Sequence, residues 1–311
     1  GRHITKKMSD LGYDITIVDN LVSESSLPPE QWMQHLKPKK KVNWVNDDAR
    51  NFFARKKEKY DIVIHLAAIV GGRIKIENAP LQVAEDLSLD AEMFNWVSKY
   101  TPEKVVFFSS SAAYPIDLQT RANHKILSED MIDLDGYNIG KPDLSYGWAK
   151  LTGEYLAKLA YQRCGIKSVC FRPFSGFGED QHTNYPFPSI LNRCLNYNGS
   201  PITVWSTGEQ VRDFIYIDDC VDGMIKIMDN IEDGSAVNLS SGKPTSFLKL
   251  IKTMCKIFHN KDEVDFNRLL DKPEGVFYRV GDTKLQEKYG FKPKYSLEDA
   301  IIRCKYILEE K

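Results

Sequence analysis

The sequence predicts an α/β protein: a Rossmann-type, doubly wound parallel sheet followed by a smaller mixed α/β region at the C-terminal end. Short apolar runs such as 104–108 alternate with longer runs of helical spacing, which is the rhythm of parallel sheets. Small residues, Ala67 and Ala68, follow one such run, and open α/β sheets bind ligands at the carboxyl ends of their strands. Beyond Gly178 the alternation of strands and helices becomes irregular. We therefore expect a Rossmann domain over 1–178 and a second region over 179–311, some of whose strands and helices pack with the first domain.

Composition excludes several classes of protein. The chain has 311 residues and a net charge of -1, which gives no reason to expect nucleic-acid binding. No apolar run has the length of a membrane span and no signal-peptide pattern is present, so we expect a cytoplasmic globular protein. The six cysteines form no Cys-x-x-Cys pair, so we expect buried reduced thiols rather than disulfides or a metal site.

The N-terminal segment has the pattern of half a nucleotide-binding unit. Ile4 and Met8 recur at helical spacing, and a short turn leads to a buried strand over 15–18 that ends at Asp19. Helix, turn, strand and acidic residue form the second half of a βαβ unit that binds a dinucleotide. We therefore expect about ten residues to precede this sequence in the natural protein, with Gly1 as the last glycine of a Gly-rich turn. The alternative is an ordinary surface helix, which leaves Asp19 unexplained.

Two further strands end in residues suited to a ligand. The run 42–45 predicts a short strand, and Asp48 then caps the next helix. The run 60–66 predicts a buried strand that ends in the two alanines, and Gly71-Gly72 beside it predicts a turn near phosphate.

The remaining elements follow from apolar spacing. Helices are expected over 80–100 and 148–163, with buried strands over 104–108 and 168–172. The polar stretch 21–40 is expected to be a loop or a short helix. In the C-terminal region we expect strands over 203–205, 214–217 and 236–239 and helices over 218–229, 247–258 and 297–308.

The motif Tyr-x-x-x-Lys occurs three times, and helix breakers favour one copy. The chemistry needs both side chains one turn apart on a helix, because residues i and i+4 are neighbours only there. Proline or glycine interrupts the copies at 100–104 and 137–141. The third copy, Tyr146 and Lys150, leads into the proline-free run 148–163. We therefore predict that Tyr146 and Lys150 form a catalytic pair.

Several short motifs, in order over nearly the whole chain, resemble the extended short-chain dehydrogenase/reductase family, in the branch that acts on nucleotide sugars. These motifs are Gly1, Val18-Asp19-Asn20-Leu21, Asp48, His65-Leu66-Ala67-Ala68, Ser109-Ser110, Tyr146-x-x-x-Lys150, Arg172-Pro173, Val204-Trp205 and Arg212-Asp213-Phe214-Ile215. Each motif alone is weak, whereas the ordered set is specific. The C-terminal motifs are more similar to GDP-sugar than to UDP-sugar enzymes, so the resemblance implies NAD and a GDP-linked sugar.

The resemblance assigns the chemistry to Ser110, Tyr146 and Lys150. Lys150 stabilises a phenolate on Tyr146, which takes a hydroxyl proton while hydride leaves the same carbon for NAD⁺. Ser110 hydrogen-bonds the same sugar oxygen; the alternative is a hydroxyl that only caps a strand end.

The resemblance also implies an NAD site at the strand ends. Asp19 accepts hydrogen bonds from the adenosine ribose and repels a 2′-phosphate, which favours NAD over NADP. Asp48 meets the adenine, and Lys150 holds the nicotinamide ribose. The expected cofactor-binding residues are Gly1, Asp19, Asn20, Asp48, Ala49, Leu66, Ala67, Ala68, Ser109, Tyr146, Lys150 and Pro173.

The resemblance also implies a set of substrate-binding residues, and the region over 179–311 is expected to bind the nucleotide sugar. The expected substrate-binding residues are Ser110, Ser111, Ser175, Arg212 and Arg279. Arg212 and Arg279 would clamp the diphosphate, because a guanidinium matches phosphate geometry; the alternative for each is a solvated arginine. Ser175 and Asp86 both stand where the family usually has asparagine, which leaves the placement of the sugar open.

Departures from the family narrow the reaction. Ser111 and Ala112 stand where the dehydratase branch has an Asp-Glu pair, and Ala112 also replaces the cysteine of the branch that epimerises carbons 3 and 5. An alanine cannot move protons, so hydride transfer at carbon 4 remains. His182 is either a second acid–base residue or an exposed histidine.

Three functions stay open. The first is an NAD-dependent dehydrogenase or reductase of a GDP-linked sugar, and the second is a 4-epimerase that returns the hydride to the other face. The third is a relative that binds NAD without turnover. The resemblance also implies a homodimer in which the helix over 80–100 and the Tyr146 helix pair with a second copy. Leu151, Tyr155 and Leu159 would serve that interface or the core.

Overall fold

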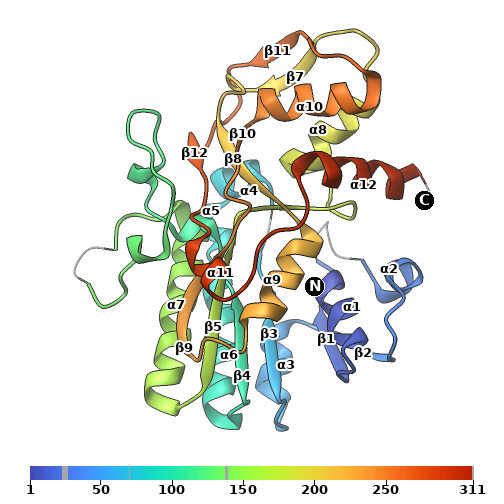
Figure 1. The fold of residues 1–311 in the computed structure, drawn as a ribbon. Helices are drawn as coiled ribbons and strands as arrows, with labels where there is room; N and C mark the ends of the chain where they lie inside the picture. The colour runs from blue at the N-terminus through green and yellow to red at the C-terminus, as the bar shows by residue number, and fades with distance from the viewer. Residues whose placement is uncertain (23–26, 70, 137–138, 310–311) are drawn as a thin grey trace.

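The structure is a computed structural model and describes residues 1–22, 27–69, 71–136 and 139–309. Its central sheet has the strand order β3 (Ile62–His65), β4 (Lys104–Phe108), β5 (Lys167–Pro173) and β9 (Asp233–Leu239), and every pair is parallel (Figure 1). A second parallel pair, β1 (Ile15–Asp19) and β2 (Val42–Asn46), lies beside it. The expected parallel α/β fold is therefore confirmed.

Strand β4 shows why this sheet has near-continuous apolar strands. Val105 and Phe107 point to one face of the sheet and Val106 to the other, and all three are fully buried. Helices cover both faces, so neither set of side chains meets water.

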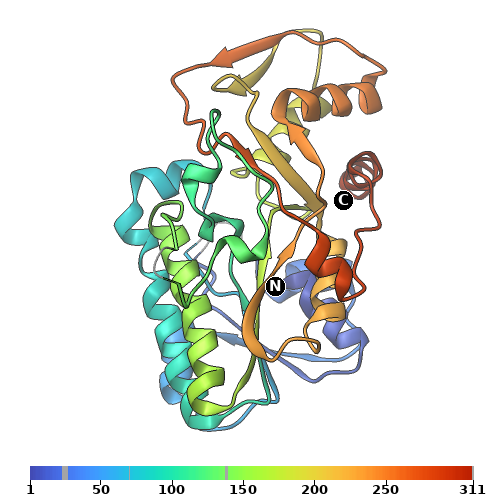
Figure 2. The same ribbon diagram turned by 60° about the vertical axis from the view of Figure 1, so that its left-hand side comes forward.

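The helices form two layers around this sheet (Figures 1 and 2). On one face, α6 (Asp86–Tyr100) and α7 (Leu144–Cys164) pack with α3 (Ala49–Arg55). On the other face, α1 (Arg2–Asp10) and α9 (Ile217–Ile227) pack against the sheet. The first lobe therefore takes one of its covering helices, α9, from the C-terminal third of the chain.

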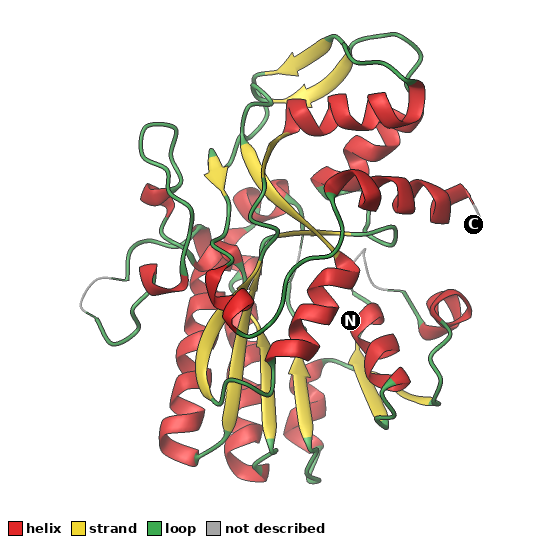
Figure 3. Ribbon diagram, in the orientation of Figure 1, coloured by secondary structure: helices red, strands yellow, loops and turns green. Residues whose placement is uncertain are grey.

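The second lobe lies above the carboxyl ends of the sheet strands (Figure 3). Its core is built on α8 (Pro186–Leu195), α10 (Phe247–His259) and α12 (Leu297–Glu309). Its short strands are β6 (Ser175–Phe177), β7 (Ile202–Trp205), β8 (Val211–Tyr216), β10 (Pro244–Ser246), β11 (Phe266–Leu269) and β12 (Tyr278–Arg279). The remaining elements are β1 (Ile15–Asp19), β2 (Val42–Asn46), α2 (Pro29–Leu36), α4 (Arg73–Asn78), α5 (Pro80–Val83), α11 (Lys284–Lys288) and three 3₁₀ turns at Ser111–Ala113, Ile116–Leu118 and Glu129–Met131.

The structure corrects some expected boundaries. The helix expected over 80–100 is two helices, α5 and α6, separated by a turn at 84–85. Helix α7 begins at Leu144, four residues before the expected start, because Pro142 and Asp143 precede its first turn. Of the other two Tyr-x-x-x-Lys copies, the one at 100–104 runs from the end of α6 into β4, and Tyr137 lies outside the described residues. None of the described helices is both long and apolar enough to cross a membrane.

Candidate active site

A cleft of about 820 Å³ is lined by residues of both lobes. The first lobe contributes the turn at Gly71-Gly72, Ser110 and Tyr146, and the second contributes Arg212 and Arg279. This places the cleft at the carboxyl edge of the parallel sheet, where α/β folds bind ligands.

Tyr146 and Lys150 lie one turn apart near the start of α7. Lys150 is 3% exposed, and its Nζ lies 5.8 Å from the centroid of the Tyr146 ring. The same ammonium lies 5.4 Å from the centroid of Phe107. The sequence-predicted pair is therefore assembled, with the lysine buried behind the tyrosine, which itself lines the cleft.

Close packing of α7 on β4 sets the depth of this lysine. Gly153 stands one turn after Lys150, and a methyl group added at Gly153 would overlap the Phe107 ring. Gly147 is equally constrained, because a methyl group there would overlap the carbonyl oxygen of Ala112. The two glycines that weaken the helix pattern therefore let α7 approach the sheet closely.

Buried charges hold Lys150 in its cationic form. Burial alone would lower its pKa, but Tyr146, Asp90 and Asp86 outweigh burial and raise the pKa of Lys150 above its ordinary value. A permanent positive charge beside Tyr146 stabilises a phenolate, which is the form that accepts a proton from a hydroxyl group.

The three serines after β4 lie in different surroundings. Ser110 lines the cleft, and its Oγ accepts a hydrogen bond from the backbone N–H of Ala112 at 3.1 Å. It therefore caps the following turn and also faces the cleft. Ser111 is buried and does not line the cleft, and Ser109 donates to buried Glu154.

The Arg172-Pro173 motif belongs to the core rather than the cleft. Arg172 donates to both carboxylate oxygens of Glu154 at 2.8 and 2.6 Å, and its guanidinium lies 4.8 Å from the centroid of Tyr114. This buried pair joins β5 to α7. The same carboxylate accepts from Ser109, so it fixes the chain just before Ser110.

The residues expected at the adenosine end of the cofactor lie at neighbouring strand ends. Asp19 ends β1 and accepts from the backbone N–H of Leu21 at 2.8 Å. Asp48 caps α3 after β2, and Asn20 donates to it at 3.5 Å. Gly1 caps α1 and Ala49 opens α3.

The expected residues nearer the nicotinamide follow β3, β4 and β5. Leu66, Ala67 and Ala68 directly follow β3. The carboxylate at the end of β1 and the small residues after β3 lie at the carboxyl ends of strands, where this type of fold binds a dinucleotide, and the buried Lys150 lies on α7 beside them. The described residues therefore fit NAD.

Two arginines bind one carboxylate in the cleft, and a third arginine lies near them. Asp143 accepts from Arg73 at 2.9 Å with both oxygens and from Arg279 at 2.9 Å. A methyl group added at Gly275 would contact both Arg73 and Arg212, so these two guanidinium groups lie close to the same point. Asp143 is the residue before α7, so this cluster lies one turn from Tyr146.

Arg212 has the electrostatic character of an anion-binding group. Burial, followed by repulsion from Arg279 and Arg73, lowers its pKa to about 9. Its guanidinium donates to its own neighbour, the carbonyl of Val211, at 2.8 Å. Arg212 is half-buried beside two like charges, so a bound anion would relieve their repulsion, which suits the expected diphosphate.

Three further residues line the cleft that were not predicted from the sequence: Arg73, Asp143 and Arg193. Asp143 precedes Tyr146 by three residues, so its presence on the same helix turn was visible in the sequence. Arg73 gave no such signal because its partners are far away in the chain.

Of two further residues considered from the sequence, Ser175 does not line the cleft and His182 does. Ser175 opens β6, is half-buried and does not line the cleft. His182 does line the cleft, and its Nδ1 accepts from the backbone N–H of Asn184 at 3.3 Å.

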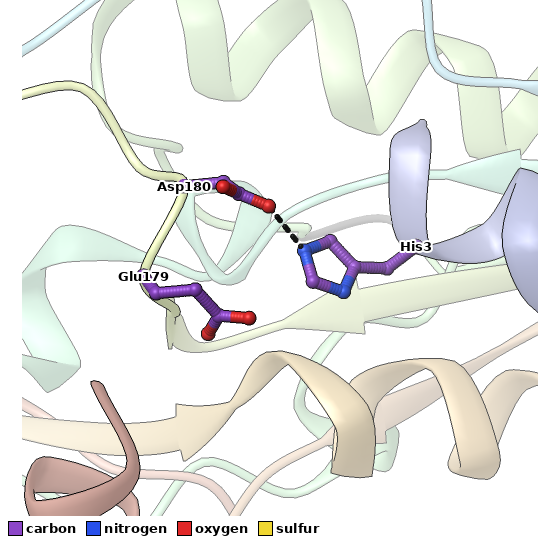
Figure 4. Close-up of side chains that lie close together, drawn as sticks. All are labelled: His3, Glu179 and Asp180. Atoms are coloured by element: carbon purple, nitrogen blue, oxygen red, sulfur yellow. Dashed lines mark hydrogen bonds and ion pairs between the residues drawn. The ribbon is translucent and has the colours of Figure 1, made fainter. Parts of the chain in front are cut away.

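A cluster of His3, Glu179 and Asp180 links α1 to the segment after β6 (Figure 4). Its ligand atoms lie within 4.8 Å of one another, a spacing that a metal ion could bridge. His3 pairs with Asp180 at 3.1 Å, and Tyr216 donates to Glu179 at 2.9 Å. The ion pair and the hydrogen bond explain why these three residues lie together: they connect the two lobes.

The fold and the site together define a Rossmann-type enzyme with a Tyr–Lys pair and a cleft lined by arginines. Residues 1–240 match the NAD dependent epimerase/dehydratase family, and the chain belongs to that family. It is therefore an NAD-dependent enzyme, which excludes the reading of a non-catalytic relative.

Named relatives cover nearly the whole chain. A putative UDP-glucose 4-epimerase from Methanocaldococcus jannaschii is 29% identical over 97% of this chain and 93% of its own length. A GDP-L-fucose synthase from Sinorhizobium fredii is 23% identical over 78% of this chain and 77% of its own. The structure of a UDP-glucuronic acid 4-epimerase from Bacillus cereus, bound to a UDP-sugar and NAD, has a TM-score of 0.84 at 22% identity, covering 100% of this chain and 96% of that one.

Proposed function

We propose that the protein is an NAD-dependent 4-epimerase of a nucleoside-diphosphate-linked sugar. The observation that carries this proposal is the cleft itself, which joins one proton-handling pair, Tyr146 and Lys150, to a cluster of arginines one helix turn away. The epimerases among the relatives and structural neighbours support it over the dehydrogenase or reductase of the sequence analysis.

The chain's own residues would act as follows. Tyr146, as a phenolate beside Lys150, takes the proton of the carbon-4 hydroxyl group. Bound NAD supplies the acceptor for the hydride that leaves the same carbon. Ser110 hydrogen-bonds the sugar oxygen during this change. Tyr146 gives its proton back when hydride returns to the opposite face of the sugar.

The arginines would hold the substrate during turnover. Arg212 and Arg279 bind the diphosphate, and Arg73 adds a third guanidinium from the first lobe. Anchoring the diphosphate keeps the keto sugar in the cleft while it turns. Retention of this intermediate distinguishes an epimerase from a dehydrogenase that releases it.

A labelled substrate tests this proposal. The enzyme is given a panel of UDP- and GDP-linked sugars deuterated at carbon 4, with excess unlabelled NAD⁺. An epimerase yields the 4-epimer with the deuterium retained and no accumulation of NADH absorbance. Accumulating deuterated NADH with a keto sugar would instead establish the dehydrogenase. The panel also tests the expected GDP-linked sugar, which stays a prediction.

We also propose that the protein is a homodimer. Trp148 and Tyr155 lie seven residues apart on α7 and are 43% and 45% exposed, and Leu87 on α6 is 40% exposed. These side chains form an apolar strip on the helices that the resemblance assigns to a dimer. Leu151 is buried and belongs to the core, and Leu159 is half-buried.

A further inference from the structure

Ionisable side chains form a sealed cluster behind Tyr146. Asp86 opens α6, Asp90 follows one turn later, and His65 ends β3. Their exposed fractions are 0%, 1% and 4%, and Lys150 completes the cluster. None of the four lines the cleft. The proposed mechanism uses Lys150, whose pKa Asp86 and Asp90 raise, but it assigns no proton to either carboxylate and no role to His65.

The two carboxylates in this cluster are incompletely hydrogen-bonded. Asp90 pairs with Nε2 of His65 at 2.9 Å, and Asp86 accepts from the backbone N–H of Ile69. The second oxygen of each carboxylate is buried and has no hydrogen-bond partner among the described residues. A buried carboxylate in this state is costly unless a cation or a proton compensates its charge.

Lys150 compensates only one of these charges. Two carboxylates face one ammonium in a space closed to solvent, and the imidazole of His65 adds a positive charge only if it is protonated. The aromatic ring of Phe107 lies between His65 and Lys150, 6.0 Å from the imidazole and 5.4 Å from Nζ. The charge balance beside Lys150 therefore depends on whether one further proton is bound.

Asp86 is the group best placed to bind that proton. It is surrounded by Lys150 on α7, Asp90 on its own helix and His65 on β3. Burial raises the pKa of Asp86, and repulsion from Asp90 adds to this, whereas Lys150, the Ile69 N–H and His65 oppose it. Asp86 is also bonded to the segment that follows β3, at the sheet edge where the cofactor fits.

We propose that Asp86 is a positioning residue that matches the charge of the site to the redox state of the cofactor. Its carboxylate is ionised when the cationic nicotinamide ring of NAD⁺ lies beside Lys150, and it binds a proton when the neutral ring of NADH lies there. The inference rests on the proposed function, because it requires NAD at the Tyr146–Lys150 pair.

This charge matching favours the oxidised cofactor. A buried negative charge attracts a cationic ring and gives nothing to a neutral one, so the protein binds NAD⁺ more tightly than NADH. An enzyme that returns its hydride in every turnover benefits, because the form that starts the next cycle is the one that is retained.

Calorimetry in two buffers of different ionisation enthalpy tests the proposal without any sugar. Titration of wild-type protein with NAD⁺ and with NADH gives both affinities and the number of protons bound. We expect NADH to bind with an uptake of roughly half a proton more than NAD⁺ near the titration midpoint of Asp86. In Asp86→Asn this difference disappears and the preference for NAD⁺ over NADH falls about tenfold, the equivalent of one pKa unit.

Control variants separate this role from a merely structural one. Asp86→Glu keeps the charge and should restore most of the NAD⁺ preference. Asp219→Asn removes another buried carboxylate, which accepts from the N–H groups of Lys294 and Tyr295, and should leave the preference unchanged. A larger effect of Asp90→Asn than of Asp86→Asn would overturn the assignment to Asp86.

The wild-type measurement remains decisive if the variants fail to fold. Equal proton uptake with NAD⁺ and NADH across pH 5 to 9 overturns the inference, whatever the variants do. That result would leave the proposed epimerase untouched, because the epimerase is judged by the fate of the carbon-4 deuterium. Loss of epimerase activity across the sugar panel, with the proton difference intact, would reject the proposed substrate and keep the charge matching.

Discussion

Arg279 donates to Asp143 at 2.9 Å, although 136 residues separate the two along the chain. The contact joins β12 of the second lobe to the first turn of α7. Asp143 also accepts from Arg73, which follows the Gly71-Gly72 turn. One carboxylate thus ties three distant segments together around the cleft, so we expect the geometry of the substrate site to depend on it.

Asp143→Asn should destabilise the protein by roughly 2 kcal/mol, because it leaves guanidinium groups near each other without their shared counter-ion. Thermal unfolding with and without a nucleoside diphosphate checks this. The added diphosphate should raise the melting temperature of the variant more than that of the wild type, since it replaces the missing charge. An equal rise in both proteins would show that the arginines do not bind the diphosphate.

The same carboxylate gives the sign of a pH effect. Burial works to raise the pKa of Asp143, but Arg279 and Arg73 outweigh it and hold that pKa below its ordinary value. The stabilisation from this pair is therefore present at neutral pH and is lost as the pH falls through the folded-state pKa, below about 4. The Asp143→Asn protein should lose less stability than the wild type over this acid range.

Tyr146→Phe should lower the rate of epimerisation by roughly 10²–10⁴-fold, because the variant lacks the hydroxyl group that carries the proton. Binding of NAD⁺ should stay within a few-fold of the wild type. Tyr155→Phe removes a hydroxyl group from the exposed face of the same helix and serves as the control. A Tyr146→Phe enzyme with near-normal turnover would exclude this tyrosine as the proton carrier.

Arg212→Lys should weaken binding of a nucleoside diphosphate about tenfold, because an ammonium cannot form the paired hydrogen bonds of a guanidinium. Isothermal titration measures this directly. Arg121→Lys is the matched control, since Arg121 is half-exposed and pairs with Glu209 and Glu274 at the surface. Equal losses in the two variants would point to a general charge effect.

Asp19→Asn should lower the preference of the protein for NAD over NADP. The wild type is expected to prefer NAD over NADP, because the carboxylate at the end of β1 repels a 2′-phosphate. In the variant, the dissociation constant for NADP divided by that for NAD should fall by about tenfold or more. Asp14→Asn, an exposed change just before the same strand, should leave the ratio unaltered.

Trp148→Glu should separate the proposed dimer into subunits of 35.6 kDa, measured by light scattering after size-exclusion chromatography. A charged side chain on the apolar strip of α7 cannot be buried against a second copy without a partner. Leu270→Glu places the same charge on a 71% exposed leucine of the second lobe and should keep the dimer. A wild-type protein that is already monomeric contradicts the proposal.

Sequence patterns predicted the elements whose signal is local. Strand β4 reads as an unbroken apolar run because both its faces are covered, and the proline-free run after Tyr146 predicted most of α7. The break between α5 and α6 had no such signal, because neither proline nor glycine marks the turn at 84–85. Propensity alone could not reveal it.

The site was predictable only in part, for a related reason. Tyr146 and Lys150 are neighbours through one helix turn, so their spacing shows their proximity. Arg73 and Asp143 are 70 residues apart in the chain and come together only in the folded structure, so no pattern of sequence spacing predicts their contact. Asp86 was visible as a departure from the family, but its sealed surroundings came only from the packing of α6 against β3 and α7.

Gly153 allows α7 to pack closely against the sheet. An alanine there would collide with Phe107 and could be relieved only by lifting α7 outward, carrying Tyr146 and Lys150 with it. A shift of about 1 Å is enough to spoil a reaction that requires near-contact between donor and acceptor. The absence of a side chain at Gly153 thus helps to set the position of Tyr146, although Gly153 faces the sheet and does not line the cleft.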